Sequence, residues 1–212
     1  MMLIGQCDSP FVRRVAVALR LYGLAHEEAA WSAFGDSDRI AAYNPLRRVP
    51  TLVLDDGFVL MDSAAILELA DDMVGPPNAF LARTGADKRI QLRLCALASG
   101  AADKGVALVY ESNLRTEQLG LWVERCRIQI GGALDQLEME RAVRSSQWLF
   151  GDTLSHADIV IGTMYRFLAE AVPHDLGLDG YPGLFAHAAA CEALPEFQAT
   201  YRPFTLTPPN PQ

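Results

Sequence analysis

Cysteine and histidine are scarce in this chain of 212 residues, which contains four of each. No two cysteines form a Cys-x-x-Cys pair, and the histidines stand isolated from one another. Because metal sites are built from clusters of such residues, we assign no metal. Widely spaced cysteines are typical of free thiols in a reducing compartment. They are Cys7, Cys95, Cys126 and Cys191.

Positive charge is also in short supply, since 18 lysines and arginines face 26 aspartates and glutamates and leave a net charge of -8. Phosphate backbones require a basic surface, so nucleic acid is not expected as a partner. No uncharged apolar run approaches the length of a membrane span, and the first residues lack the basic and apolar regions of a signal peptide. We therefore expect a cytoplasmic protein with no membrane partner.

Hydrophobic residues are abundant, at half of the sequence, which is enough for one large domain or two small ones. The first third alternates strand-like and helix-like segments, the pattern of an α/β domain. Strands are predicted at residues 3–4, 25–31 and 49–61, the last folded into a hairpin at Asp55-Asp56-Gly57. Everything beyond about residue 86 has helical periodicity, so an all-α region is expected there.

One helix start, directly behind the first strand, carries the clearest chemical signal. Ser9 favours the N-cap position and Pro10 the first helical position. Phe11, Val15 and Leu19 continue at helical spacing. The free N–H groups and the positive dipole end of such a helix favour an anion, and a hydroxyl at the cap adds a donor. Most caps bind nothing, so a purely structural Ser9 is the alternative.

Two further helix starts stand out. Asp62 and Ser63 precede an apolar stripe and are predicted to cap a second helix. Ser155-His156-Ala157-Asp158 is a capping box with Asp in place of the usual Glu, and we expect it to serve folding.

Three segments in this order, 9–13, 44–52 and 62–66, followed by a helical half with the capping box, resemble the cytosolic glutathione S-transferase family. The serine at the helix start is similar to bacterial-type members. The resemblance implies a thioredoxin-like domain with the order βαβαββα at residues 1–76, a linker at 77–86, an all-helical domain at 87–212 and a homodimer. It also implies a cis peptide bond between Val49 and Pro50.

The resemblance also implies how glutathione binds. The hydroxyl and N–H of Ser63 would hold the γ-glutamyl carboxylate, and Asp62 would face the amine. The cis bond to Pro50 would leave the N–H and C=O of Val49 without partners in the sheet, and these groups would pair with the cysteinyl part of the ligand. Arg48 would reach the glycyl carboxylate, although its neighbour in the Arg47-Arg48 pair is an alternative.

Ser9 would then stabilise the glutathione thiolate, which attacks a small hydrophobic electrophile in a detoxification reaction. A glutathione-dependent oxidoreductase that uses Cys7, an isomerase or dehalogenase, and a non-catalytic binding or regulatory protein are the alternatives. In this family the second substrate binds where the helical domain faces the helix-start serine. The apolar candidates for that site are Phe11, Leu108, Tyr110 and Tyr165.

Overall fold

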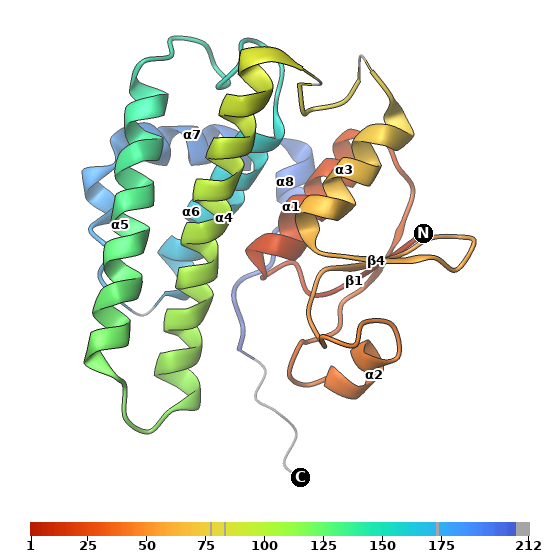
Figure 1. Ribbon diagram of the computed structural model, residues 1–212, viewed down its shortest axis with the longest axis horizontal. Coiled ribbons are helices and arrows are strands. Elements are labelled where there is room, and N and C mark those ends of the chain that lie inside the picture. The colour runs from red at the N-terminus through yellow and green to blue at the C-terminus, as the bar shows by residue number, and fades with distance from the viewer. Residues whose placement is uncertain (77, 83, 173, 207–212) are drawn as a thin grey trace. The chain divides into compact units, whose positions relative to one another are not determined.

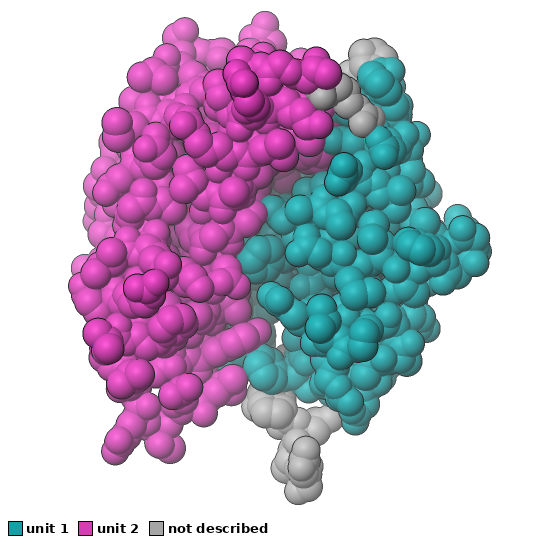
Figure 2. Space-filling model, in the orientation of Figure 1, with its two compact units in different colours: residues 1–79, 195–212 teal, residues 80–194 magenta. Residues whose placement is uncertain are grey.

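A computed structural model describes residues 1–76, 78–82, 84–172 and 174–206 (Figure 1). The chain divides into two compact units, coloured separately in Figure 2. The first contains residues 1–79 and the chain from Pro195 onward, and the second contains residues 80–194.

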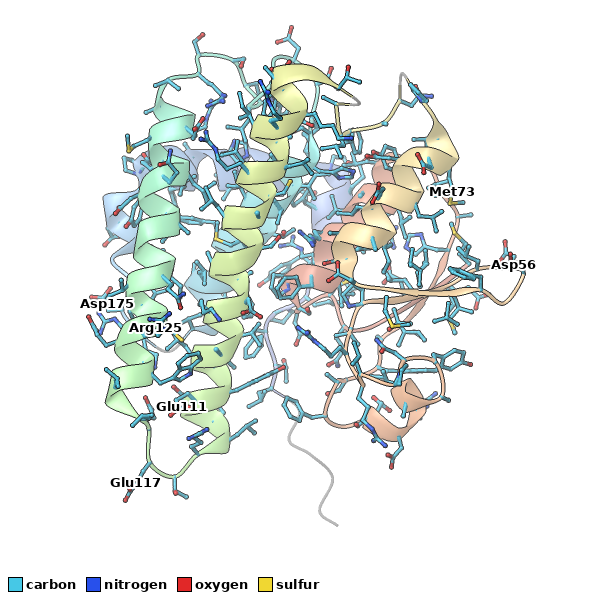
Figure 3. The ribbon with its side chains drawn as sticks, in the orientation of Figure 1. Asp56, Met73, Glu111, Glu117, Arg125 and Asp175 are labelled. Carbon is cyan, nitrogen blue, oxygen red and sulfur yellow. The ribbon has the colours of Figure 1, made fainter. Side chains whose placement is uncertain are left out.

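A mixed sheet forms the centre of the first unit, with strands in the order β2-β1-β3-β4. The strands are β1 (Met2–Ile4), β2 (Glu27–Ala29), β3 (Thr51–Val53) and β4 (Val59–Met61). β1 pairs in parallel with β2, and the other pairs are antiparallel. The predicted hairpin is confirmed, with Asp56 at its tip (Figure 3) and Gly57 at a φ of 86°, which an L side chain rarely adopts.

Three helices accompany this sheet: α1 (Pro10–Leu21), α2 (Ser37–Ala41) and α3 (Ser63–Val74). α1 and α3 pack against one another, and the side chains of Val12, Val15 and Leu19 are fully buried. The order of elements is βαβαββα, which confirms the predicted thioredoxin-like domain. The five residues of α2 are too few to show a helical period in the sequence.

The second unit is helical. Its helices are α4 (Gly85–Leu114), α5 (Gly120–Ala142), α6 (His156–Ala171), α7 (Pro182–Glu192) and the short 3-10 helix η1 (Leu178–Gly180). α6 is buried along nearly its whole length, and α4 packs against both α5 and α6. A Cβ at Gly105 would lie 2.6 Å from Leu168 Cδ2, so a larger residue there would displace side chains in the α4–α6 contact. Within the described ranges, every helix is too short or too polar to cross a bilayer.

The end of the chain returns to the first unit. The helix α8 (Pro195–Thr200) packs against α1, whereas the sequence-based division placed residues 87–212 together. Of the linker predicted at 77–86, residues 77 and 83 lie outside the described residues, and α4 already begins at Gly85.

The capping box of α6 forms as the sequence predicts. Ser155 and Asp158 are buried, and the Asp158 carboxylate accepts hydrogen bonds from Ser155 N at 2.8 Å, Ser155 Oγ at 2.6 Å and Leu149 N at 2.9 Å. Both carboxylate oxygens act as acceptors in a buried site, and together they join the helix start to the loop before it.

The substitution Asp158→Asn should therefore destabilise the protein, because an amide places a donor where an acceptor is needed. We expect the free energy of unfolding to fall by about 2–4 kcal/mol, measured by urea denaturation. The exposed Asp152 provides the matched control, and Asp152→Asn should change stability by less than about 0.5 kcal/mol. Equal effects of the two substitutions would contradict the capping role.

Candidate functional site

Strand register gathers three loops at one edge of the sheet. Thr51, the first residue of β3, pairs with Ile4 at the end of β1 and with Met61 at the end of β4. The loop after β1, the loop before β3 and the start of α3 therefore meet at the same edge. All three belong to the first unit.

The loop after β1 presents Ser9. Ser9 is the N-cap of α1, with extended φ and ψ of -73° and 127°, and its Oγ accepts a long 3.5 Å hydrogen bond from Val12 N. Accepting that bond leaves the hydroxyl proton free to donate. In the described part of the chain this proton has no acceptor, and the side chain is partly exposed. The predicted cap is confirmed, and its geometry leaves a donor for an anion at the positive end of the helix.

The loop before β3 approaches the same point through Val49. A Cβ on Gly5 would lie 2.5 Å from Val12 Cγ2 and 2.9 Å from Val49 Cβ, so these segments are in contact at a glycine whose φ is 137°. The Val49–Pro50 bond is cis, as the resemblance implied. Across the described ranges, neither the N–H nor the C=O of Val49 has a hydrogen-bond partner. This pair of groups is available to an extended peptide ligand.

Asn44 holds this loop in shape, a role that the sequence analysis did not predict. The buried Asn44 amide donates to Arg48 O at 3.0 Å and to Thr51 Oγ1 at 2.9 Å, and its Oδ1 accepts from Leu46 N at 2.9 Å. One side chain thus binds the backbone of Leu46 and Arg48 and the hydroxyl of Thr51.

The two adjacent arginines differ in their surroundings. The Arg47 guanidinium lies 2.7 Å from Asp38 Oδ1 and donates to Ser37 Oγ at 3.1 Å. The exposed Arg48 side chain has neither a hydrogen bond nor an ion pair to any residue that the structure describes. Arg48 is therefore the cation of this pair that is free to meet a ligand anion.

At the start of α3, Asp62 has a φ of 74° and a ψ of 126°, far from any region that non-glycine residues favour. Its Oδ1 caps the helix by accepting from Ala64 N at 2.8 Å, and the residue is exposed. Such strain is of the order of 1–3 kcal/mol and concentrates at ligand sites. The strained backbone is consistent with the predicted ligand contact of Asp62, which stays a prediction.

Ser63 follows as the first residue of α3 and is buried. Its Oγ accepts a hydrogen bond from the guanidinium of Arg14, which is itself buried on α1. A positive charge therefore stands beside the helix start where an anion was predicted to bind. Arg14 was not among the predicted site residues. The only feature in the sequence that could have indicated this role is a charged residue one turn after Phe11, on a helix whose other residues are mostly apolar.

Cys7, the alternative reactive residue, occupies an apolar position. Its side chain is buried, and this burial, with a smaller contribution from the Glu28 carboxylate, raises the pKa of the thiol to about 11. Almost no thiolate is then present at neutral pH, which disfavours Cys7 as a nucleophile.

The four residues predicted for the second substrate divide between the units. Phe11 is partly buried in the first unit. In the second, Leu108 is fully buried, Tyr110 is 37% exposed, and the buried Tyr165 donates its hydroxyl to Leu178 O at 3.3 Å. Their assembly around one ligand stays a prediction. Among the described residues, no group of three or more histidine, cysteine, aspartate or glutamate side chains could hold a metal.

Comparisons with known proteins agree on one family. The family model for the N-terminal domain of glutathione S-transferase matches residues 8–73, and that for the C-terminal domain matches residues 121–190. An uncharacterized GST-like protein of Escherichia coli, YibF, is 32% identical over 139 residues, which cover 65% of this chain and 68% of that protein.

Solved structures give the same result. A glutathione S-transferase of Methylobacterium radiotolerans in complex with glutathione sulfonate is 25% identical, with a TM-score of 0.89 over 100% of this chain and 98% of the other. A glutathione S-transferase of Methylobacillus flagellatus with GSH bound is 27% identical, with a TM-score of 0.85 over 96% and 99% of the two chains.

The environment of Cys7 predicts a slow reaction with alkylating reagents. With a pKa of about 11, roughly one thiol in 3,000 is ionised at pH 7.5, against about one in ten for an unfolded thiol. We expect iodoacetamide to modify Cys7 at least about 100-fold more slowly in the native protein than in urea, as measured by peptide mass spectrometry. The native rate should rise with pH up to about 11. Rapid native labelling at pH 7.5 would contradict the burial of this thiol.

Proposed function

This chain belongs to the glutathione S-transferase family, and we propose that it binds glutathione at its first unit and conjugates the glutathione sulfur to a small hydrophobic electrophile. The solved relatives with GSH or glutathione sulfonate bound support the choice of ligand. Ser9 carries the proposal, because its unused hydroxyl proton stands at the positive end of α1, at the sheet edge shared with Val49 and Ser63.

Glutathione offers two carboxylates, one amine and one thiol, and the site has a group for each. The γ-glutamyl carboxylate meets Ser63 at the start of α3, where Arg14 adds positive charge. The amine faces Asp62. The cysteinyl backbone pairs with Val49, and the glycyl carboxylate meets Arg48.

The hydroxyl of Ser9 donates a hydrogen bond to the ionised sulfur. A hydrogen bond to a charged group contributes about 1.5–3 kcal/mol, which lowers a thiol pKa of about 8.5 by about one to two units. The thiolate then forms a carbon–sulfur bond with the electrophilic carbon, and the leaving group departs with the electron pair of the bond that breaks. The enzyme contributes by orienting the thiolate and raising its ionised fraction.

The alternatives have less support. The raised pKa of Cys7 opposes an oxidoreductase that depends on its thiolate. A non-catalytic binding protein would retain glutathione but show no conjugation with a chloronitroaromatic substrate. Homodimer formation, cytoplasmic location and a role in detoxification stay predictions.

Removal of the Ser9 hydroxyl tests the mechanism. In Ser9→Ala, the pKa of the bound thiol should rise by about one to two units, because the donor to the anion is lost. At pH 6.5 we expect kcat/KM to fall about ten- to thirty-fold, with the difference shrinking as the pH rises above the higher pKa. The pH profile of conjugation and the absorbance of the bound thiolate both measure this shift.

Ser9→Thr provides the matched control, since it retains the hydroxyl and should keep most of the activity at pH 6.5. A wild-type pH profile in Ser9→Ala, together with loss of activity in Cys7→Ser, would transfer the role to Cys7.

The neighbouring arginines provide a matched pair for glutathione affinity. Arg48→Ala should raise the KM for glutathione about ten-fold and leave kcat at saturation nearly unchanged, because a binding contact is lost. Arg47→Ala should change KM less than about two-fold, since Arg47 is occupied by Asp38 and Ser37. Steady-state kinetics with varied glutathione distinguish the two, and equal effects would contradict the assignment of Arg48.

A further inference from the structure

The residues that follow α8 lie against the loop that presents Ser9. Beyond α8, the segment 201–206, here called the C-terminal strap, runs past the first turn of α1 (Figure 1). Both the strap and the loop belong to the first unit. Neither the family models, which end at residue 190, nor the proposed glutathione contacts include it.

Arg13 holds the base of the strap. Its guanidinium is buried and donates to Phe197 O at 2.9 Å. The same group lies over the rings of Phe197 and Tyr201, at 5.6 Å and 5.5 Å from their centroids. A buried arginine that combines a carbonyl acceptor with two aromatic faces fixes the direction in which the chain leaves α8.

Asp8 holds the far end. Its Oδ2 accepts a hydrogen bond from Thr205 N at 3.2 Å, across almost the whole length of the sequence. Asp8 directly precedes Ser9, and the N–H groups of Ser9 and Thr205 both stabilise its carboxylate. The strap is thus attached on both sides of Ser9, at the residue before it and one turn after it.

The position of Asp8 is an unfavourable one for a charge. Burial raises the pKa of this carboxyl, and the backbone N–H groups offset that effect only in part. A carboxyl whose pKa is higher in the folded than in the unfolded protein lowers stability once the pH exceeds the unfolded value. At neutral pH, ionisation of Asp8 therefore lowers the stability of the fold relative to the protonated carboxyl.

We propose that the C-terminal strap is part of the thiolate site and that Asp8 is a positioning residue, which holds the loop of Ser9 by bridging it to Thr205. This inference rests on the proposed function of Ser9. The strap adds no group to the reaction itself; it limits the movement of the loop, so that the Ser9 hydroxyl keeps its direction toward the sulfur.

Substitution of Asp8 separates positioning from other roles. Asp8→Ala removes the acceptor, and we expect the pKa of the bound glutathione thiol to rise by about half a unit to one unit, with kcat/KM at pH 6.5 falling about three- to ten-fold. Asp8→Asn retains one acceptor oxygen, so its thiol pKa and its kcat/KM should stay close to those of the wild type. In the double variant Asp8→Ala with Ser9→Ala, the thiol pKa should equal that of Ser9→Ala alone, because the bridge acts through the hydroxyl.

Truncation tests the strap without altering the loop. A chain that ends at Arg202 loses Thr205 and should reproduce the thiol pKa of Asp8→Ala. A chain that ends at Leu206 keeps the strap and should behave as the full chain. An unchanged thiol pKa in the shorter chain, or full additivity of Asp8→Ala and Ser9→Ala, would overturn the proposal.

Hydrogen exchange in the ligand-free protein supplies a readout that does not depend on glutathione. Amides of residues 6–9 should exchange faster in Asp8→Ala and in the chain ending at Arg202, but not in Asp8→Asn. Unchanged exchange in the first two variants would overturn the bridge even if the function of Ser9 holds. A different result would refute the role of Ser9 instead: exchange is faster in these two variants, but the pKa of the bound thiol in Ser9→Ala is the same as in the wild type. The bridge would then exist without a catalytic consequence.

Discussion

The pairing of Thr51 with both Ile4 and Met61 is the constraint on which the site depends. Because β3 is antiparallel to both neighbours, its first residue lies beside the last residues of β1 and β4. A shift by one residue would turn the buried Leu52 toward the opposite face and separate the loops that carry Ser9, Val49 and Ser63. The apolar core of the first unit therefore fixes the positions of polar groups that contribute little to it.

Two serines at helix starts show why the same local motif has different consequences. The Ser155 hydroxyl is buried and donates to the Asp158 carboxylate at 2.6 Å, so its proton is consumed within the fold. The Ser9 hydroxyl is partly exposed and accepts a 3.5 Å bond from Val12, with its proton unused within the described residues. Burial and the presence of an acid three residues later make the first a structural cap. Ser9 is not buried and has no acid three residues later, so its hydroxyl remains a donor for a ligand.

Local signals in the sequence predicted local features well. The cap at Ser9, the capping box at Ser155 and the hairpin at Gly57 each depend on residues within a few positions, and all are present. Contacts between distant residues were not predictable in this way. The bond from Arg14 to Ser63 spans 49 positions, and the bond from Thr205 to Asp8 spans 197. No periodicity or turn pattern encodes such pairs, because tertiary packing creates them.

The adjacent arginines of α1 explain how an acidic protein can present a site for an anion. The net charge of -8 would repel a peptide with two carboxylates, although screening limits that repulsion to about 10 Å at ordinary ionic strength. Consecutive residues on a helix point in different directions, so Arg13 reaches α8 while Arg14 reaches α3. Arg13, Arg20 and Arg202 each lower the pKa of the nearby Cys7 thiol, although burial outweighs them. Positive side chains therefore lie near the loop of Ser9 and near the start of α3 despite the negative overall charge, and two of them, Arg13 and Arg14, also join α1 to its neighbours.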